Sequence, residues 1–192
     1  MKKIVIASNN KHKIEEYKLM LNEYEILTLE DIGFEDDIEE TGTTFLENAF
    51  IKAKTVSEFI KKKGLKYDVL GDDSGCCVPS LNNEPGIYSA RYAGNHDFKA
   101  NRNKLIQNLK NKDHKAYFIT VIVLYHIDGS YTYKEGKTYG EIIDEERGDT
   151  SFGYESIFLS DDLNKTFGEA TTLEKNKVSH RSRALAQIKE EL

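Results

Sequence analysis

IVIASNN, residues 4–10, is the stretch that decides the fold class. Its first four residues are apolar and three of them are β-branched, which predicts a short buried strand. The polar triplet SNN ends that strand, and Asn10 is placed to cap the helix that follows. The apolar residues of this helix recur at Ile14, Tyr17, Leu19 and Leu21. A strand, a polar turn and a helix in this order open an α/β unit.

The rest of the chain alternates between patterns typical of helices and of strands. Thr44 and Glu47 have the spacing of a capping box, and the helix that they begin ends near Gly64. Its apolar residues recur every three or four positions at Phe45, Ala49, Ala53, Val56 and Ile60. Further helices are predicted over residues 97–112 and 179–192, and strands over residues 69–70, 117–127, 131–134 and 139–143, with a hairpin turn at residues 128–129. This mixture predicts an α/β fold with a mixed β-sheet flanked by helices.

Composition limits the class of protein. The 192 residues fit a single domain over residues 1–192, with two prolines and no low-complexity linker. The formal net charge of −6 disfavours a nucleic-acid partner that is bound by phosphate neutralisation. No stretch approaches the ~20 apolar residues of a membrane span, and residues 4–7 are too short for a signal peptide. Cys76 and Cys77 are too few and too close for a disulfide framework, so a reducing compartment is expected.

The turn after the first strand has the character of an anion site. It comprises Ser8, Asn9, Asn10, Lys11, His12 and Lys13. Amide groups at a helix N-terminus attract anions, small polar side chains allow close approach, and the lysines add positive charge. The glycine spacing of a Walker A loop is absent. Taken alone, the same residues also fit a plain capped turn.

Asp72 and Asp73 follow a short apolar run, where two adjacent carboxylates repel each other and lose hydration. A divalent cation relieves both costs, and Mg²⁺ prefers one or two carboxylates together with substrate phosphates. Glu39, just before the helix that begins at Thr44, offers another ligand, and Lys52 on that helix could reach phosphates. Each of these features has an alternative explanation. The acidic pair also fits an Asp-rich turn, residues 30–40 a solvated acidic loop, and Lys52 a solvated lysine.

Two further segments fit a nucleotide. SFGYE, residues 151–155, places aromatic side chains around a flexible glycine, which offers a stacking face to a nucleobase. Residues 174–181 bring cations and a histidine to the start of the last helix, where Ser179 is the predicted N-cap and cations oppose the helix dipole unless an anion is bound. Core filling and a basic surface turn are the alternatives. With the anion-type turn and the acidic pair, these segments predict a purine nucleoside triphosphate with Mg²⁺ as the ligand.

The same residues resemble the motifs of the inosine/xanthosine triphosphate pyrophosphatase family, in order and over almost the whole chain. The first block is ASNNKHK at residues 7–13 with Glu16, and the second is EETG at 39–42 with Phe45, Glu47, Asn48, Ala49 and Lys52. The third is DDSG at 72–75, followed by Leu81, PG at 85–86 and YSARY at 88–92. The last are FGY at 152–154, Lys175, SHR at 179–181 and RAL at 183–185. Asn9, where many members have Gly, and Glu155, where the family usually has Asp, depart from the pattern.

This resemblance implies hydrolysis of ITP, dITP or XTP to the monophosphate and pyrophosphate by a homodimer with a central cleft between two lobes. The net charge of −6 suits a cytoplasmic protein. Asp73 would be a Mg²⁺ ligand and the base that orients the attacking water, Glu39 the second ligand, and Asp72 a support for the metal. The triphosphate would be bound by Ser8, Asn9, Asn10, Lys11, His12, Lys13, Lys52 and Ser74. The base would stack on Phe152 in a pocket shaped by Gly153, Tyr154 and Glu155 and completed by Lys175, His180 and Arg181.

Three other interpretations are open. Maf-like nucleotide pyrophosphatases have a similar architecture and a different base preference, and the ordered motifs disfavour them. A non-catalytic nucleotide sensor is disfavoured by the intact acidic pair, and a nucleic-acid-binding module by the net charge of −6. Incubation with ITP and Mg²⁺, followed by detection of IMP and pyrophosphate, separates all of these.

Overall fold

The computed structural model describes residues 1–192 and divides the chain into two compact units. The first unit comprises Met1–Asp73, Val121–Glu135 and Ala184–Leu192. The second comprises Ser74–Thr120 and Gly136–Arg183. Three strands contribute residues to both units, namely β3 (Asp68–Val78), β5 (Lys115–Tyr125) and β6 (Tyr131–Ile142).

The seven strands form one mixed sheet with the order β2-β1-β3-β5-β6-β7, and β4 (Glu84–Pro85) pairs with β3. β1 (Lys3–Ile6) lies parallel to both β2 (Glu25–Leu27) and β3, with Val5 opposite Val69. The pairs β3–β4 and β6–β7 are antiparallel, β7 being Phe158–Ser160. The predicted α/β fold with a mixed sheet is therefore confirmed.

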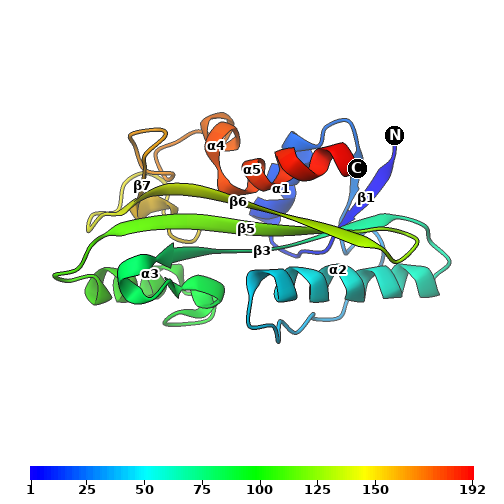
Figure 1. Ribbon diagram of the computed structural model, residues 1–192, viewed down its shortest axis with the longest axis horizontal. Coiled ribbons are helices and arrows are strands. Elements are labelled where there is room, and N and C mark those ends of the chain that lie inside the picture. Colours follow the sequence, from blue (N-terminus) through cyan, green and yellow to red (C-terminus); the bar gives the residue numbers. More distant parts are fainter. The chain divides into compact units, whose positions relative to one another are not determined.

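In the first unit, helices cover both faces of the strands (Figure 1). α2 (Phe45–Lys62) lies on one face, and α1 (Lys11–Met20) lies on the other with the end of α5 (His180–Ile188). Alternate strand residues pack on opposite sides of the sheet. One core joins the strand residues Val5, Val69, Val121 and Val123 to Ala49, Ala53, Val56 and Ile60 of α2. The other joins the strand residues Ile4, Ile6, Leu70, Ile122 and Leu124 to Tyr17, Leu21, Leu185 and Ile188. Burial on both faces explains why these strands read as continuous apolar runs.

The second unit has its own core. α3 (Phe98–Asn108) contributes the fully buried Leu105, and Leu109 follows directly after the helix. These residues join a cluster in which Phe118 stacks on Phe158 with ring centroids 4.1 Å apart. The remaining helical elements are α4 (Thr172–Val178) and the short 3₁₀ turns η1 (Pro79–Leu81), η2 (Gly86–Arg91) and η3 (Glu155–Ile157) in this unit, with η4 (Lys189–Glu191) at the end of the first.

The predicted helix caps are confirmed. Asn10 and Thr44 accept hydrogen bonds from the backbone N–H groups of Lys13 and Glu47, and Ser179 Oγ accepts one from Ser182. None of the helices combines the length and hydropathy that crossing a bilayer requires.

Several predicted element bounds were wrong. α3 ends four residues earlier than predicted, α4 was not predicted, and β6 is one strand where the sequence indicated two. Leu19 was assigned to the apolar side of α1 but is 55% exposed. The segment DDSG, placed after a predicted strand that ends at residue 70 and with an Asp-rich turn as one interpretation, lies inside β3, because its two carboxylates meet lysines that are distant in sequence.

Candidate active site

The turn between β1 and α1 is held by its own side chains. Ser8 Oγ accepts a hydrogen bond from the Asn10 backbone N–H at 3.2 Å, and Asn10 Oδ1 accepts one from the Lys13 N–H at 3.3 Å. The Ala7 N–H donates to the Leu70 carbonyl at 2.8 Å, which fixes the turn beside β3. The side chains exposed to solvent here are Asn9, Lys11 and His12.

The acidic pair is buried in the middle of β3. Asp72 and Asp73 are 2% and 6% exposed. Gly71, just before them, packs against the backbone of Ala49 and Ala53 in α2, where a Cβ atom would have no room. This close approach places α2 beside the two carboxylates.

Two buried polar residues of α2, one turn apart, contact Asp73. Asn48 Nδ2 donates to Asp73 Oδ2 at 3.1 Å, and Lys52 Nζ lies 3.8 Å from Asp73 Oδ1. Lys52 also donates to Glu40 Oε1 at 2.6 Å. Asn48 Oδ1 accepts from the Gly42 N–H at 2.9 Å, so a single fully buried amide connects the loop before α2 to the Asp73 carboxylate.

The second aspartate has its own lysine. Lys13 Nζ lies 3.0 Å from Asp72 Oδ2, and both side chains are largely buried. The group therefore contains three carboxylates and two ammonium groups, those of Glu40, Asp72, Asp73, Lys13 and Lys52. We call these five residues the carboxylate–lysine cluster.

Burial and charge act in opposite directions on the pKa values in this cluster. Burial raises the pKa of Asp73, although Lys52 and Lys13 pull it down. Burial lowers the pKa of Lys52, but the carboxylates of Asp73, Asp72 and Glu40 outweigh this effect, so the net shift is upward. The cluster thus holds a carboxylate that binds a proton more readily than usual beside a firmly protonated lysine.

The donor atoms of the cluster fit a hard cation that takes few protein ligands. They are carboxylate oxygens, and no group of three or more His, Cys, Asp or Glu side chains is arranged as a ready-made metal centre. Mg²⁺ commonly binds through one or two carboxylates and completes its shell with water and substrate phosphates. Glu39, the predicted second ligand, is exposed, and it is the neighbouring Glu40 that contacts Lys52.

In the second unit, the loop SFGYE approaches α3. The half-buried Phe152 ring lies edge-on to Phe98, with centroids 5.7 Å apart. Gly153 has φ +54°, in the left-handed region that favours glycine. Tyr154 is 5% exposed and donates from its hydroxyl to the Ser89 carbonyl at 2.7 Å, and burial raises its pKa. Tyr154 therefore supports the loop from the core, while Phe152 lies nearer the surface.

The predicted cationic residues are paired within this unit. Lys175 Nζ lies 3.0 and 2.8 Å from the two carboxylate oxygens of Glu155. Arg181, 3% exposed, donates from Nη2 to Ser74 Oγ at 3.1 Å. The His180 ring is 5.3 Å from Phe118. The Lys175–Glu155 ion pair thus joins α4 to the aromatic loop, and the Arg181–Ser74 hydrogen bond joins α5 to β3.

The predicted site residues fall into two groups, one in each unit. The first group is Ser8, Asn9, Asn10, Lys11, His12, Lys13, Glu39, Lys52 and Asp73, and the second is Ser74, Phe152, Gly153, Tyr154, Glu155, Lys175, His180 and Arg181. The sequence patterns gave no role to Asn48 or Glu40. Both residues stand in the second motif block quoted above, and Asn48 carried a further signal, as a polar residue on the apolar side of an amphipathic helix.

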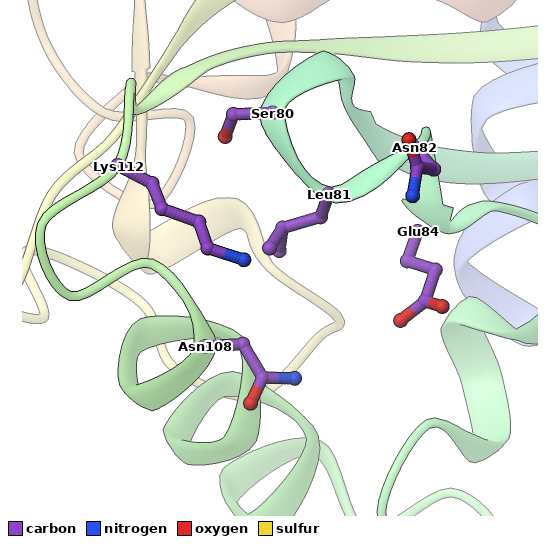
Figure 2. Close-up of a pocket in the computed structure, with 6 residues that line it drawn as sticks. All are labelled: Ser80, Leu81, Asn82, Glu84, Asn108 and Lys112. Carbon is purple, nitrogen blue, oxygen red and sulfur yellow. The ribbon is translucent and has the colours of Figure 1, made fainter.

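A hollow of about 230 Å³ lies elsewhere in the second unit (Figure 2). It is lined by Ser80, Leu81, Asn82, Glu84, Asn108 and Lys112, which come from η1 and the residue after it, from β4, and from the end of α3 and the loop that follows it. None of the predicted site residues lines it.

The first unit combines an α/β fold with a largely buried group of three carboxylates and two ammonium groups. The sequence profile of the Ham1 family matches residues 4–191, and the chain belongs to this family. It is 45% identical to a dITP/XTP pyrophosphatase from Clostridium perfringens, covering 100% of this chain and 98% of that protein. A protein of the same name from Bacillus subtilis is 41% identical, covering 98% and 96%.

Solved structures agree with these sequence relatives. The Ham1 protein of Staphylococcus aureus superimposes with a TM-score of 0.85 and 40% identity, covering 99% of this chain and 97% of that one. A HAM1 protein from Coxiella burnetii gives the same TM-score at 36% identity. The predicted family membership is therefore confirmed.

Proposed function

We propose that the protein hydrolyses non-canonical purine nucleoside triphosphates, namely ITP, dITP or XTP, to the monophosphate and pyrophosphate with the help of Mg²⁺. The carboxylate–lysine cluster carries the proposal, because it buries two adjacent aspartates and neutralises them with Lys13 and Lys52. The names of the relatives, dITP/XTP pyrophosphatase, support the substrate class.

The cluster is suited to exchange its partners when substrate binds. Its lysines now neutralise carboxylates, and a triphosphate offers them oxygens of higher negative charge. Mg²⁺, held by Asp73 with Glu39 or another nearby carboxylate, would screen charge on the phosphates when bound. Lys13 and Lys52 then bind phosphate oxygens, together with the turn formed by residues 8–13 and with Ser74.

Asp73 is the proposed catalytic base. It orients a water molecule and takes its proton while the water oxygen bonds to the α-phosphorus, and the bond from that phosphorus to the pyrophosphate oxygen breaks. The raised pKa of the buried Asp73 makes it a stronger base than an exposed aspartate. Asn48 holds one oxygen of this carboxylate, which limits the directions that the other oxygen can take.

The aromatic loop and the cationic residues near the last helix are the proposed base contacts. Phe152 stacks on the purine, Gly153, Tyr154 and Glu155 shape the pocket, and Lys175, His180 and Arg181 complete it. The Arg181 guanidinium is donor-only, so it suits the 6-oxo group of hypoxanthine or xanthine better than a 6-amino group. A homodimer belongs to the same proposal and rests on the resemblance stated above, and a cytoplasmic location rests on the acidic charge and the two free cysteines.

The decisive experiment is an incubation of the purified protein with ITP and Mg²⁺, with chromatographic detection of IMP and a coupled assay for pyrophosphate. We expect equimolar IMP and pyrophosphate, and slow turnover of ATP and GTP under the same conditions. Release of IDP and orthophosphate would contradict attack at the α-phosphorus. Light scattering after gel filtration tests the dimer separately.

A further inference from the structure

Arg102 of α3 holds the loop that carries Phe152. It is 3% exposed, and its guanidinium makes two hydrogen bonds in different directions. Nη1 donates to the Gly153 carbonyl at 2.9 Å, and Nε donates to Glu146 Oε1 at 2.7 Å. A buried cation therefore links one helix to two points of the segment that follows β6.

The position of the accepted carbonyl matters. Gly153 directly follows Phe152, and its φ of +54° fixes the turn of the chain at this point. Phe98, four residues before Arg102 and thus on the same side of α3, packs edge-on against the Phe152 ring at 5.7 Å. One face of α3 thus holds the backbone next to Phe152, at the Gly153 carbonyl, through a polar contact and the Phe152 ring through an apolar one.

The loop has a second anchor that does not need Arg102. The Tyr154 hydroxyl donates to the Ser89 carbonyl inside the core at 2.7 Å. Glu146, the partner of Arg102, has a side chain that is one-third exposed, so the guanidinium is buried beside a partly hydrated carboxylate. Burial of a cation in this way is an expensive means of mere packing, because an apolar side chain of similar size fills the same space without losing hydration. The distinctive contribution of Arg102 is a set of hydrogen bonds in fixed directions, which a planar guanidinium makes and an apolar side chain cannot.

We propose that the Arg102–Glu146 pair positions Phe152 for stacking and thereby sets the affinity of the protein for the purine base. Arg102 acts through the loop and does not itself contact the nucleotide. The inference rests on the proposed function, and it adds a positioning pair that lies outside the predicted site.

The test is a split between KM and kcat. Arg102→Met keeps the length of the side chain and removes both donors, so we expect KM for ITP to rise about tenfold while kcat stays within about twofold. Inhibition by inorganic tripolyphosphate, which lacks a base, should be unchanged. Arg102→Lys keeps the charge but lacks the guanidinium fork, so its KM for ITP should lie between that of the wild type and that of Arg102→Met. Lys99→Met, which removes an exposed cation from the same helix, is the matched control and should leave KM unchanged.

Glu146→Ala keeps the test falsifiable if Arg102→Met does not fold, because the altered side chain is partly exposed. It should raise KM about threefold and speed amide hydrogen exchange in residues 151–154, with tripolyphosphate inhibition unchanged. Unchanged KM in the folded Arg102 and Glu146 variants, with normal wild-type turnover, overturns this inference and leaves the proposed function intact. Equal weakening of tripolyphosphate inhibition and of KM also overturns it, since the pair would then act on the whole fold. Absence of ITP turnover in the wild type overturns the proposed function and this inference with it.

Discussion

Asp73→Asn separates the chemistry of the carboxylate–lysine cluster from its contribution to stability. The substitution keeps the shape of the side chain and an oxygen that can still accept from Asn48 Nδ2, now 3.1 Å away. It removes the negative charge that lies 3.8 Å from Lys52, which retains its bond to Glu40 at 2.6 Å. The loss is therefore confined to charge and basicity.

We expect Asp73→Asn to lower kcat strongly and to change Tm only slightly, in either direction. General-base catalysis contributes about 10²–10⁴-fold, and loss of a metal ligand adds to this, so kcat should fall at least ~10³-fold. Burial disfavours the ionised form of Asp73, since its pKa is raised, and a neutral amide avoids that penalty at neutral pH. We expect Tm to fall by no more than about 5 °C, or to rise.

The assay is pyrophosphate release from saturating ITP and Mg²⁺, with Tm measured on the same preparations. Asp37→Asn is the matched control, because it removes the same charge from an exposed position of the acidic segment. A kcat within tenfold of wild type would refute the role of Asp73 as base and ligand. Loss of activity together with a collapse of Tm would place Asp73 in the fold and not in the chemistry.

Four further outcomes are expected. Excess chelator should abolish turnover, and Mg²⁺ should restore it better than Ca²⁺, which coordinates more loosely at longer distances; full activity in chelator contradicts the metal role. Because Mg²⁺ binding needs the ionised Asp73 carboxylate and burial raises the pKa of Asp73 in the metal-free cluster, the Mg²⁺ concentration for half-maximal turnover should begin to rise on acidification at a pH above the ordinary aspartate value of 3.8, and a constant Mg²⁺ requirement down to that pH argues against Asp73 as a ligand. Asn48→Ala removes a hydrogen bond to a charged group and should lower kcat roughly tenfold or more with the fold kept, whereas unchanged kcat would limit Asn48 to a structural role. Arg181→Ala should lower kcat/KM for ITP far more than for ATP, and an equal fall for both would assign Arg181 to the phosphates or to the fold.

Local signals were enough to predict the α/β opening. β-branched residues before a polar triplet, and Asn10 and Thr44 as caps, act through neighbours in sequence, so their effect can be inferred without the fold. The hairpin at residues 128–129 is of the same kind. The mixed sheet followed from these pieces and from the connection rules that join them.

Contacts distant in sequence explain what the patterns missed. Asp, Ser and Gly favour turns, so DDSG was assigned to one, but its carboxylates are compensated by Lys13 and Lys52, which no local window reveals. The contact of Lys52 with Glu40 likewise depends on the path of the loop before α2. β6 continues through the polar residues 135–137 because strand pairing and the buried Gly136 and Thr138 outweigh local polarity there.

Gly71 connects these levels of the structure. Its missing Cβ lets the backbone of α2 approach β3 at Ala49 and Ala53, which is a requirement of packing alone. The same approach sets Asn48 and Lys52 against Asp73, so the geometry of the proposed base follows from how closely a helix can pack on a strand. Burial at this contact raises the pKa of Asp73. The lysines offset the cost of burying the two carboxylates, and in the proposed mechanism phosphate and metal replace these ion pairs. The acidic pair can therefore occupy the interior of a strand because the cluster around it is complete only with the fold, and its proposed reactivity arises from the same burial that makes it costly.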